Sequence, residues 1–215
     1  MNLPNRLTVM RMALVPVFIL FYYLGTPASL EGPLSLDSPD AHTTLYFAVA
    51  AFAVFAIASI TDALDGHIAR KRSLITNFGK LMDPLADKVL TAAAFVCFVD
   101  TGRMAAWMLV VILAREFAIT GLRGVAASEG VVIAAGMSGK LKTVLQMSAV
   151  LLILLGIIFQ TAALGPDGIA GNGVLMGLWT FFDRLGVICL WAAVAVTIWS
   201  GVEYLWKGRS LLNAK

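Results

Sequence analysis

Four aspartates, Asp62, Asp65, Asp83 and Asp87, are the residues of this sequence whose type and spacing could do chemistry. The first two are three residues apart, so on a helix they would share one face. The second two are four residues apart and would share a face in the same way. If the two helices are antiparallel neighbours, all four carboxylates converge at one end of the pair. Converging carboxylates repel one another strongly in a low dielectric, so the set needs positive charge nearby.

Divalent cations are the counter-charge that suits this set best. Aspartate oxygens are the hard ligands that Mg²⁺ and Mn²⁺ prefer. Four carboxylates together with a substrate diphosphate suit a site for two such cations. One carboxylate must then be able to take a proton from an attacking hydroxyl. The pattern therefore indicates metal-dependent transfer of a phosphorus-bearing group.

Three residues beside the aspartates favour the same chemistry. Gly66 and Gly79 lack a side chain that would block the approach of a phosphate or a nucleobase. Arg70 offers a planar guanidinium fork to phosphate oxygens.

The composition indicates which elements must position these residues. Of 215 residues, 60% are hydrophobic and 13% are charged, whereas soluble domains carry about 25% charged residues. So apolar a chain has too little polar surface to stay dissolved as a monomer. The net charge of +3 is too small to argue for a nucleic-acid partner.

Six membrane-spanning helices are predicted within a single domain, residues 1–215, of an all-α integral membrane protein. A span needs about 20 mostly apolar residues. Four uncharged runs approach or exceed this length, and two further runs are interrupted by charges. The residues before the first span, Met1–Arg11, are expected to form a short helix at the membrane surface. The uncharged runs are Met12–Leu30, Thr43–Ile60, Thr143–Pro166 and Leu185–Val202, and the interrupted ones are about Leu81–Val99 and Met104–Ser128.

The distribution of lysine and arginine predicts the orientation. With the N-terminus in the cytoplasm, six spans place every Lys and Arg except Arg103 and Arg184 on the cytoplasmic side. Both termini and the aspartate site are then cytoplasmic, in a multi-pass protein of the cytoplasmic (inner) membrane. The plainer alternative, aspartates in exposed loops, is disfavoured because ionisable residues at span ends are costly without partners or a function. Tyr204 and Trp206 are interpreted as interfacial anchors near the end of the last span.

The spacing around the aspartates resembles the signature of the CDP-alcohol phosphotransferase family, D-x2-D-G-x2-A-R-x8-9-G-x3-D-x3-D. All eight positions match at the right spacing. In order they are Asp62, Asp65, Gly66, Ala69, Arg70, Gly79, Asp83 and Asp87. A gapped motif of this length is far more specific than a short glycine pattern.

The resemblance implies a role for each motif position. Asp62, Asp65 and Asp83 would be ligands of two divalent cations, Mg²⁺ or Mn²⁺. Asp87 would be the general base and would also reach one metal. An acceptor hydroxyl would attack the lipid-side phosphorus of a CDP-lipid, and CMP would leave. The family also implies a core of six spans and a homodimer. The pocket for the CMP part of the lipid would be formed by Gly66, Ala69, Arg70 and Gly79.

Two further stretches resemble the phosphatidylglycerophosphate synthases within that family. They are Asn2–Arg11 and Arg115–Arg123, the latter followed by Gly139–Gln146. The resemblance implies CDP-diacylglycerol and sn-glycerol 3-phosphate as substrates, with Asn5 and Thr8 reaching toward the CDP-lipid. A phosphorylated acceptor needs cations, and guanidinium groups can hold a phosphate with paired hydrogen bonds. The candidates are Arg115, Arg123, Lys140 and Lys142; the alternative is an ordinary basic rim with an Arg115–Glu116 pair.

Other functions remain open at this point. The same chemistry could use phosphatidylglycerol (as a cardiolipin synthase does), inositol phosphate or serine as the acceptor. A divalent-cation transporter would also use clustered aspartates, but it gives no reason for Gly66, Ala69, Arg70 and Gly79 at fixed spacing. A structural membrane protein without catalytic activity would keep its function after Asp62→Ala.

Overall fold

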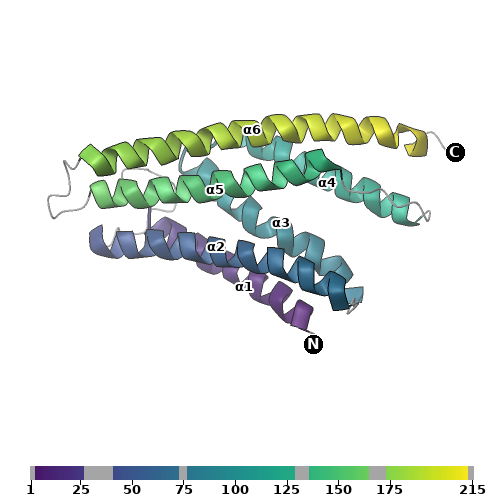
Figure 1. Ribbon diagram of the computed structural model, residues 1–215, viewed down its shortest axis with the longest axis horizontal. Coiled ribbons are helices and arrows are strands. Elements are labelled where there is room, and N and C mark those ends of the chain that lie inside the picture. The colour runs from purple at the N-terminus through teal and green to yellow at the C-terminus, as the bar shows by residue number, and fades with distance from the viewer. Residues whose placement is uncertain (1–2, 27–40, 73–76, 129–135, 165–172, 213–215) are drawn as a thin grey trace.

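The computed structural model describes residues 3–26, 41–72, 77–128, 136–164 and 173–212 (Figure 1). Within these ranges the regular backbone consists of six α-helices and contains no strand. This confirms the all-α class predicted from the composition. The helices are α1 (Leu3–Leu24), α2 (Ala41–Arg72), α3 (Asn77–Asp100), α4 (Ala106–Ser128), α5 (Met137–Ala163) and α6 (Gly173–Leu212).

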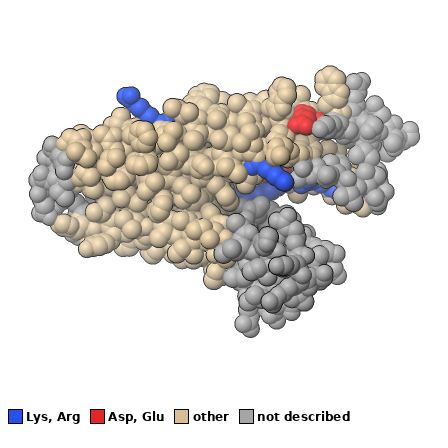
Figure 2. Space-filling model, viewed as in Figure 1, with Lys and Arg blue, Asp and Glu red and all other residues tan. Residues whose placement is uncertain are grey.

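Several helices are suited to crossing a membrane. Among the described residues, three segments are long and apolar enough to span it: His42–Thr61 in α2, Met137–Ala163 in α5 and Gly173–Tyr204 in α6. A shorter apolar segment, Val9–Leu24, lies in α1. The described surface in Figure 2 is mostly free of Lys, Arg, Asp and Glu side chains. The chain is therefore a multi-pass membrane protein.

One predicted boundary is wrong, and another helix extends past its uncharged run. Helix α1 runs without interruption from Leu3 to Leu24, so the expected surface helix is continuous with the first apolar segment. Nothing in the sequence between them breaks a helix. Helix α2 continues beyond Ile60 to Arg72, which adds charged turns to the end of an apolar span. Its 32 residues extend about 48 Å, longer than a hydrocarbon core of about 30 Å.

Successive helices run in opposite directions through the bundle, so one end of each helix lies at the same end of the bundle. The start of α1, the end of α2, the start of α3, the end of α4, the start of α5 and the end of α6 lie toward the same side of Figure 1. We call this side the motif end. Helices α5 and α6 pack along each other, α1 packs on α2 and α3, α2 contacts α5, and α4 contacts α6.

Buried aromatic rings hold α1, α2 and α3 together. Phe18 of α1 lies 5.7 Å, centroid to centroid, from Phe55 of α2. Tyr22 of α1 lies 5.8 Å from Phe98 of α3. All four side chains are almost completely buried. Tilted aromatic pairs of this kind add to the packing that orients the helices.

Small residues let α5 and α6 approach closely. A Cβ atom at Gly186 would lie 2.7 Å from Cγ1 of Ile153. A Cβ atom at Gly156 would lie 3.3 Å from the backbone nitrogen of Asp183. Membrane helices use such residues because close backbone contact drives their association in lipid.

Polar contacts fix the end opposite the motif end. Arg103 Nη1 donates to Oδ1 of Asp183 at 2.7 Å, and the same guanidinium donates to Gln160 of α5. Tyr23 donates to Oδ2 of Asp100 at 2.8 Å. These contacts tie the α3–α4 turn to α1, α5 and α6, which keeps the helices in register.

Candidate active site at the motif end

The eight motif residues lie on helical backbone at the motif end. Asp62 directly follows Thr61, the last residue of the apolar segment of α2. The aspartate pairs therefore lie on helices, as their spacing predicts. The side chains of the motif residues, and those of Asn5 and Thr8 in α1, are outside the described part of the structure, so their assigned roles stay predictions. In α2 the motif residues are Asp62, Asp65, Gly66, Ala69 and Arg70, and in α3 they are Gly79, Asp83 and Asp87.

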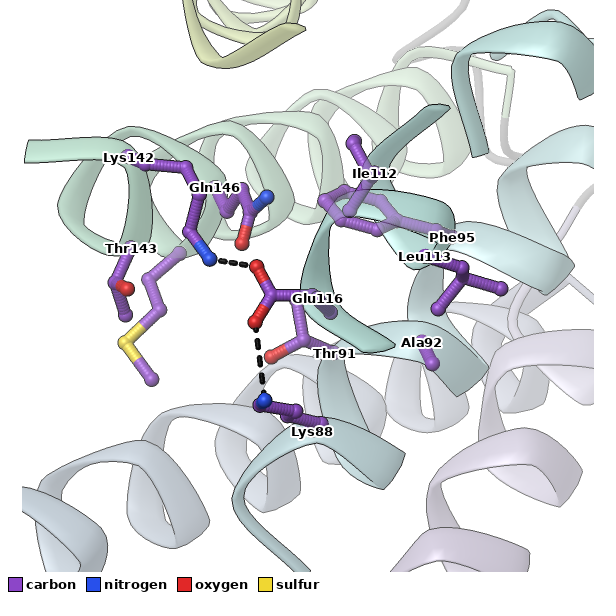
Figure 3. A pocket seen from close by; sticks show the side chains of 11 residues that line it. Lys88, Thr91, Ala92, Phe95, Ile112, Leu113, Glu116, Lys142, Thr143 and Gln146 are labelled. Atoms are coloured by element: carbon purple, nitrogen blue, oxygen red, sulfur yellow. Dashed lines mark ion pairs between the residues drawn. The ribbon is translucent and has the colours of Figure 1, made fainter. Parts of the chain in front are cut away.

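Glu116 of α4 contacts side chains of α3 and α5 (Figure 3). Its Oε2 lies 3.2 Å from Nζ of Lys88 in α3, and its Oε1 pairs with the ammonium of Lys142 in α5. Arg115 Nη1 is more distant, at 3.7 Å from Oε1. Lys88 also donates to Oγ1 of Thr120, at 2.5 Å. We call Lys88, Glu116, Thr120 and Lys142 the Glu116 cluster.

The Glu116 cluster anchors α3 at the residue next to Asp87. Lys88 follows Asp87 in the chain, and its contacts with α4 restrain this turn of α3. Lys142 is 4% exposed and Glu116 is 8% exposed. Buried charges are tolerated when paired, and removing one partner leaves the other uncompensated. The cluster therefore makes the position of α3 depend on α4 and α5.

A small cavity with a partly polar wall adjoins the cluster. Its volume is about 40 Å³, and its lining includes Lys88, Thr91, Glu116, Lys142 and Gln146. Nε2 of Gln146 is buried and has no hydrogen-bond partner among the described residues. The polar groups in its wall and its volume are sufficient for ordered water.

Two arginines of α4 meet at one aromatic ring of α6. The guanidinium carbon of Arg115 lies 5.4 Å from the centroid of the Tyr204 ring, and that of Arg123 lies 5.9 Å from it. Arg115 Nε also donates to Oγ of Ser200 at 3.1 Å. Nε of Arg123 is buried without a hydrogen-bond partner among the described residues.

The cations predicted to bind the acceptor phosphate are therefore in different settings. Arg115 and Arg123 converge on Tyr204, Lys142 is paired with Glu116, and Lys140 is exposed. The Arg115–Glu116 contact considered from the sequence is present, but both lysines of the Glu116 cluster lie closer to the carboxylate.

The sequence does not predict that Lys88 pairs with Glu116 or that Tyr204 contacts two arginines. Trp206 is 77% exposed, which fits an interfacial anchor, whereas Tyr204 is only 6% exposed and lies under two guanidiniums. A single sequence gives no sign of this, because the contacts depend on which helices pack together.

Comparisons with known proteins agree with the motif. The family model described as CDP-alcohol phosphatidyltransferase matches residues 1–199. The CDP-diacylglycerol–glycerol-3-phosphate 3-phosphatidyltransferase of Bacillus subtilis (strain 168) is 42% identical over 99% of this chain and 97% of that protein. The protein of the same name from Rickettsia bellii is 35% identical over 94% and 93%. A probable phosphatidylglycerophosphate synthase of Mycobacterium tuberculosis is 34% identical over 95% and 80%.

Proposed function

Because the chain belongs to the CDP-alcohol phosphatidyltransferase family, we propose that it transfers the phosphatidyl group of CDP-diacylglycerol to sn-glycerol 3-phosphate. The products are phosphatidylglycerophosphate and CMP, and the reaction serves phospholipid biosynthesis. The observation that carries the proposal is the 42% identity to a 3-phosphatidyltransferase over nearly the full length of both chains. The complete eight-position motif supports the same chemistry.

In the proposed reaction the acceptor hydroxyl is the nucleophile. Asp87 takes the proton of this hydroxyl as its oxygen attacks the phosphorus that carries diacylglycerol. A new phosphorus–oxygen bond forms, the bond to the CMP phosphate breaks, and the electron pair leaves with CMP. Gly66, Ala69, Arg70 and Gly79 bind the cytidine end of the donor, together with Asn5 and Thr8 from the start of α1.

The carboxylates of Asp62, Asp65, Asp83 and Asp87 fit two divalent cations, Mg²⁺ or Mn²⁺. All four are hard oxygen donors. One pair lies in the last turns of α2 and the other in the first turns of α3, both at the motif end. When bound, such cations neutralise the diphosphate and stabilise the departing phosphate. Each helix supplies two of the four proposed donors, so loss of either pair removes half of the donor set.

The acceptor phosphate would be held by the cations of α4 and α5. Arg115 and Arg123 are the strongest candidates, because they lie together at Tyr204 and Nε of Arg123 has no partner among the described residues. Lys140 is exposed and free to approach an anion from the start of α5. Lys142 would have to share its ammonium between Glu116 and the phosphate.

We further propose that the whole chain, residues 1–215, is one membrane domain that works as a homodimer. Its termini and its active site would face the cytoplasm. The positive-inside distribution supports this orientation, with Arg103 and Arg184 as the exceptions on the far side. The pairing of Arg103 with Asp183 at the end opposite the motif end fits this arrangement.

Purified protein assayed with different acceptors tests the proposed function. CMP release is followed with CDP-diacylglycerol, Mg²⁺ and one acceptor at a time: sn-glycerol 3-phosphate, inositol phosphate, serine or phosphatidylglycerol. Release that depends on sn-glycerol 3-phosphate and stops with EDTA is the expected result. Release with another acceptor would keep the family chemistry and reject the proposed substrate. Cation uptake into proteoliposomes without CMP release would indicate a transporter instead.

A further inference from the structure

Tyr204 of α6 lies where α4, α5 and α6 meet at the motif end. Its ring faces the guanidiniums of Arg115 and Arg123, at 5.4 and 5.9 Å from the centroid. Its hydroxyl accepts a hydrogen bond, at 2.8 Å, from the backbone N–H of Gly136, the residue that caps the start of α5. One buried side chain thus contacts both arginines and the start of the helix that carries Lys140 and Lys142.

An aromatic ring suits this position better than a carboxylate would. Two guanidiniums close together repel each other, and the negative face of the ring attracts both. A carboxylate would attract them more strongly, but it would occupy the N–H groups that a phosphate must bind. Glu116 shows that alternative: it engages the ammonium groups of Lys88 and Lys142, whereas Nη1 of Arg115 lies farther from it, at 3.7 Å.

We propose that Tyr204 is a positioning residue, which holds Arg115 and Arg123 side by side so that their N–H groups can bind the phosphate of the acceptor. This inference rests on the proposed function and adds a determinant of its specificity for phosphorylated acceptors. Tyr204 lies beyond residue 199, where the match to the family model ends. The inference therefore depends on contacts in this structure and not on the motif.

The test compares Tyr204→Met with Tyr204→Phe. Loss of the ring in Tyr204→Met should raise KM for sn-glycerol 3-phosphate about tenfold, the size expected when cation–π contacts at a partly desolvated site are lost. KM for CDP-diacylglycerol and kcat should each change less than about threefold, because the ring acts on acceptor binding. Tyr204→Phe keeps the ring and should keep KM for the acceptor within about threefold.

Trp206→Met is the matched control, because Trp206 is an exposed aromatic residue two positions further along the same helix. Its KM values should equal those of the wild type. An unchanged acceptor KM in a folded Tyr204→Met protein would overturn the inference. So would a rise in Tyr204→Phe as large as that expected for Tyr204→Met, and this result does not require the methionine variant to fold.

A double-mutant cycle checks that Tyr204 acts through the arginines. In an Arg123→Gln background, Tyr204→Met should raise the acceptor KM by clearly less than it does alone, because part of what the ring positions is gone. Fully independent effects would contradict the inference. Failure of the wild type to release CMP with sn-glycerol 3-phosphate would instead reject the proposed function, so the two failures are distinguishable.

Discussion

Asp87 is the residue on which the proposed chemistry depends most directly. Asp87→Asn keeps the size and polarity of the side chain but removes the base. Turnover should fall about 10²- to 10⁴-fold, the usual contribution of general base catalysis, while CDP-diacylglycerol binding is largely kept. Steady-state CMP release and a donor-binding measurement on the same preparation check this.

Asp62→Asn is the comparison, since it should also raise the Mg²⁺ concentration needed for half-maximal rate. Near wild-type turnover in Asp87→Asn would mean that another group is the base.

Lys142 and Lys140 are two residues apart in α5 but differ in burial. Lys142→Met leaves the buried carboxylate of Glu116 with one close partner fewer. Breaking a buried pair costs about 3–5 kcal/mol, so the thermal midpoint in detergent should fall clearly. Lys140→Met removes an exposed charge and should leave the midpoint nearly unchanged. Equal midpoints for the two variants would show that the Glu116 cluster contributes little to stability.

At this scale, the sequence predicts the residues of a local motif better than it predicts long-range partners. The aspartate pairs are encoded by spacing within one helix, which requires only helical periodicity. Tyr204 and Arg115 are far apart in the chain and meet only because α4 packs on α6. The same holds for Glu116 and Lys142, whose contact depends on how α4 and α5 are placed.

At the scale of helices, the contact between α5 and α6 depends on residues without side chains. Gly186→Ala would place a methyl group 2.7 Å from Cγ1 of Ile153 and 3.1 Å from its backbone nitrogen. Overpacking of this kind costs about 1–3 kcal/mol, so the thermal midpoint should fall. Gly177→Ala in the same helix meets nothing within 4 Å and should be neutral or slightly stabilising, because alanine favours a helix. A Gly186→Ala midpoint at or above that of Gly177→Ala would contradict the packing.

The helices that carry long apolar runs could be predicted from the sequence, but their ends could not. α2 extends to Arg72 and α1 begins at Leu3, because polar residues can continue a helix beyond the hydrocarbon core. The charged residues that interrupted the predicted third and fourth spans are partly explained by the contact of Lys88 with Glu116.

For the whole molecule, the proposed orientation places the motif end in the cytoplasm. A reporter that fluoresces only in the cytoplasm, fused after Lys215, should be bright. Alkaline phosphatase at the same position should be inactive, because it folds only outside the cytoplasm. The control is alkaline phosphatase fused after Gly102, in the α3–α4 turn, which should be active. The reverse pattern would place the active site on the wrong face for the proposed substrates.

The most direct test of phosphatidyl transfer is the incorporation of radiolabel from sn-[¹⁴C]glycerol 3-phosphate into lipid by the purified protein, with CMP release measured in the same reaction. With CDP-diacylglycerol and Mg²⁺, we expect one labelled lipid for each CMP released, and neither product after EDTA or in Asp87→Asn. CMP release without labelled lipid, or no release with an intact and folded protein, would contradict phosphatidyl transfer to this acceptor.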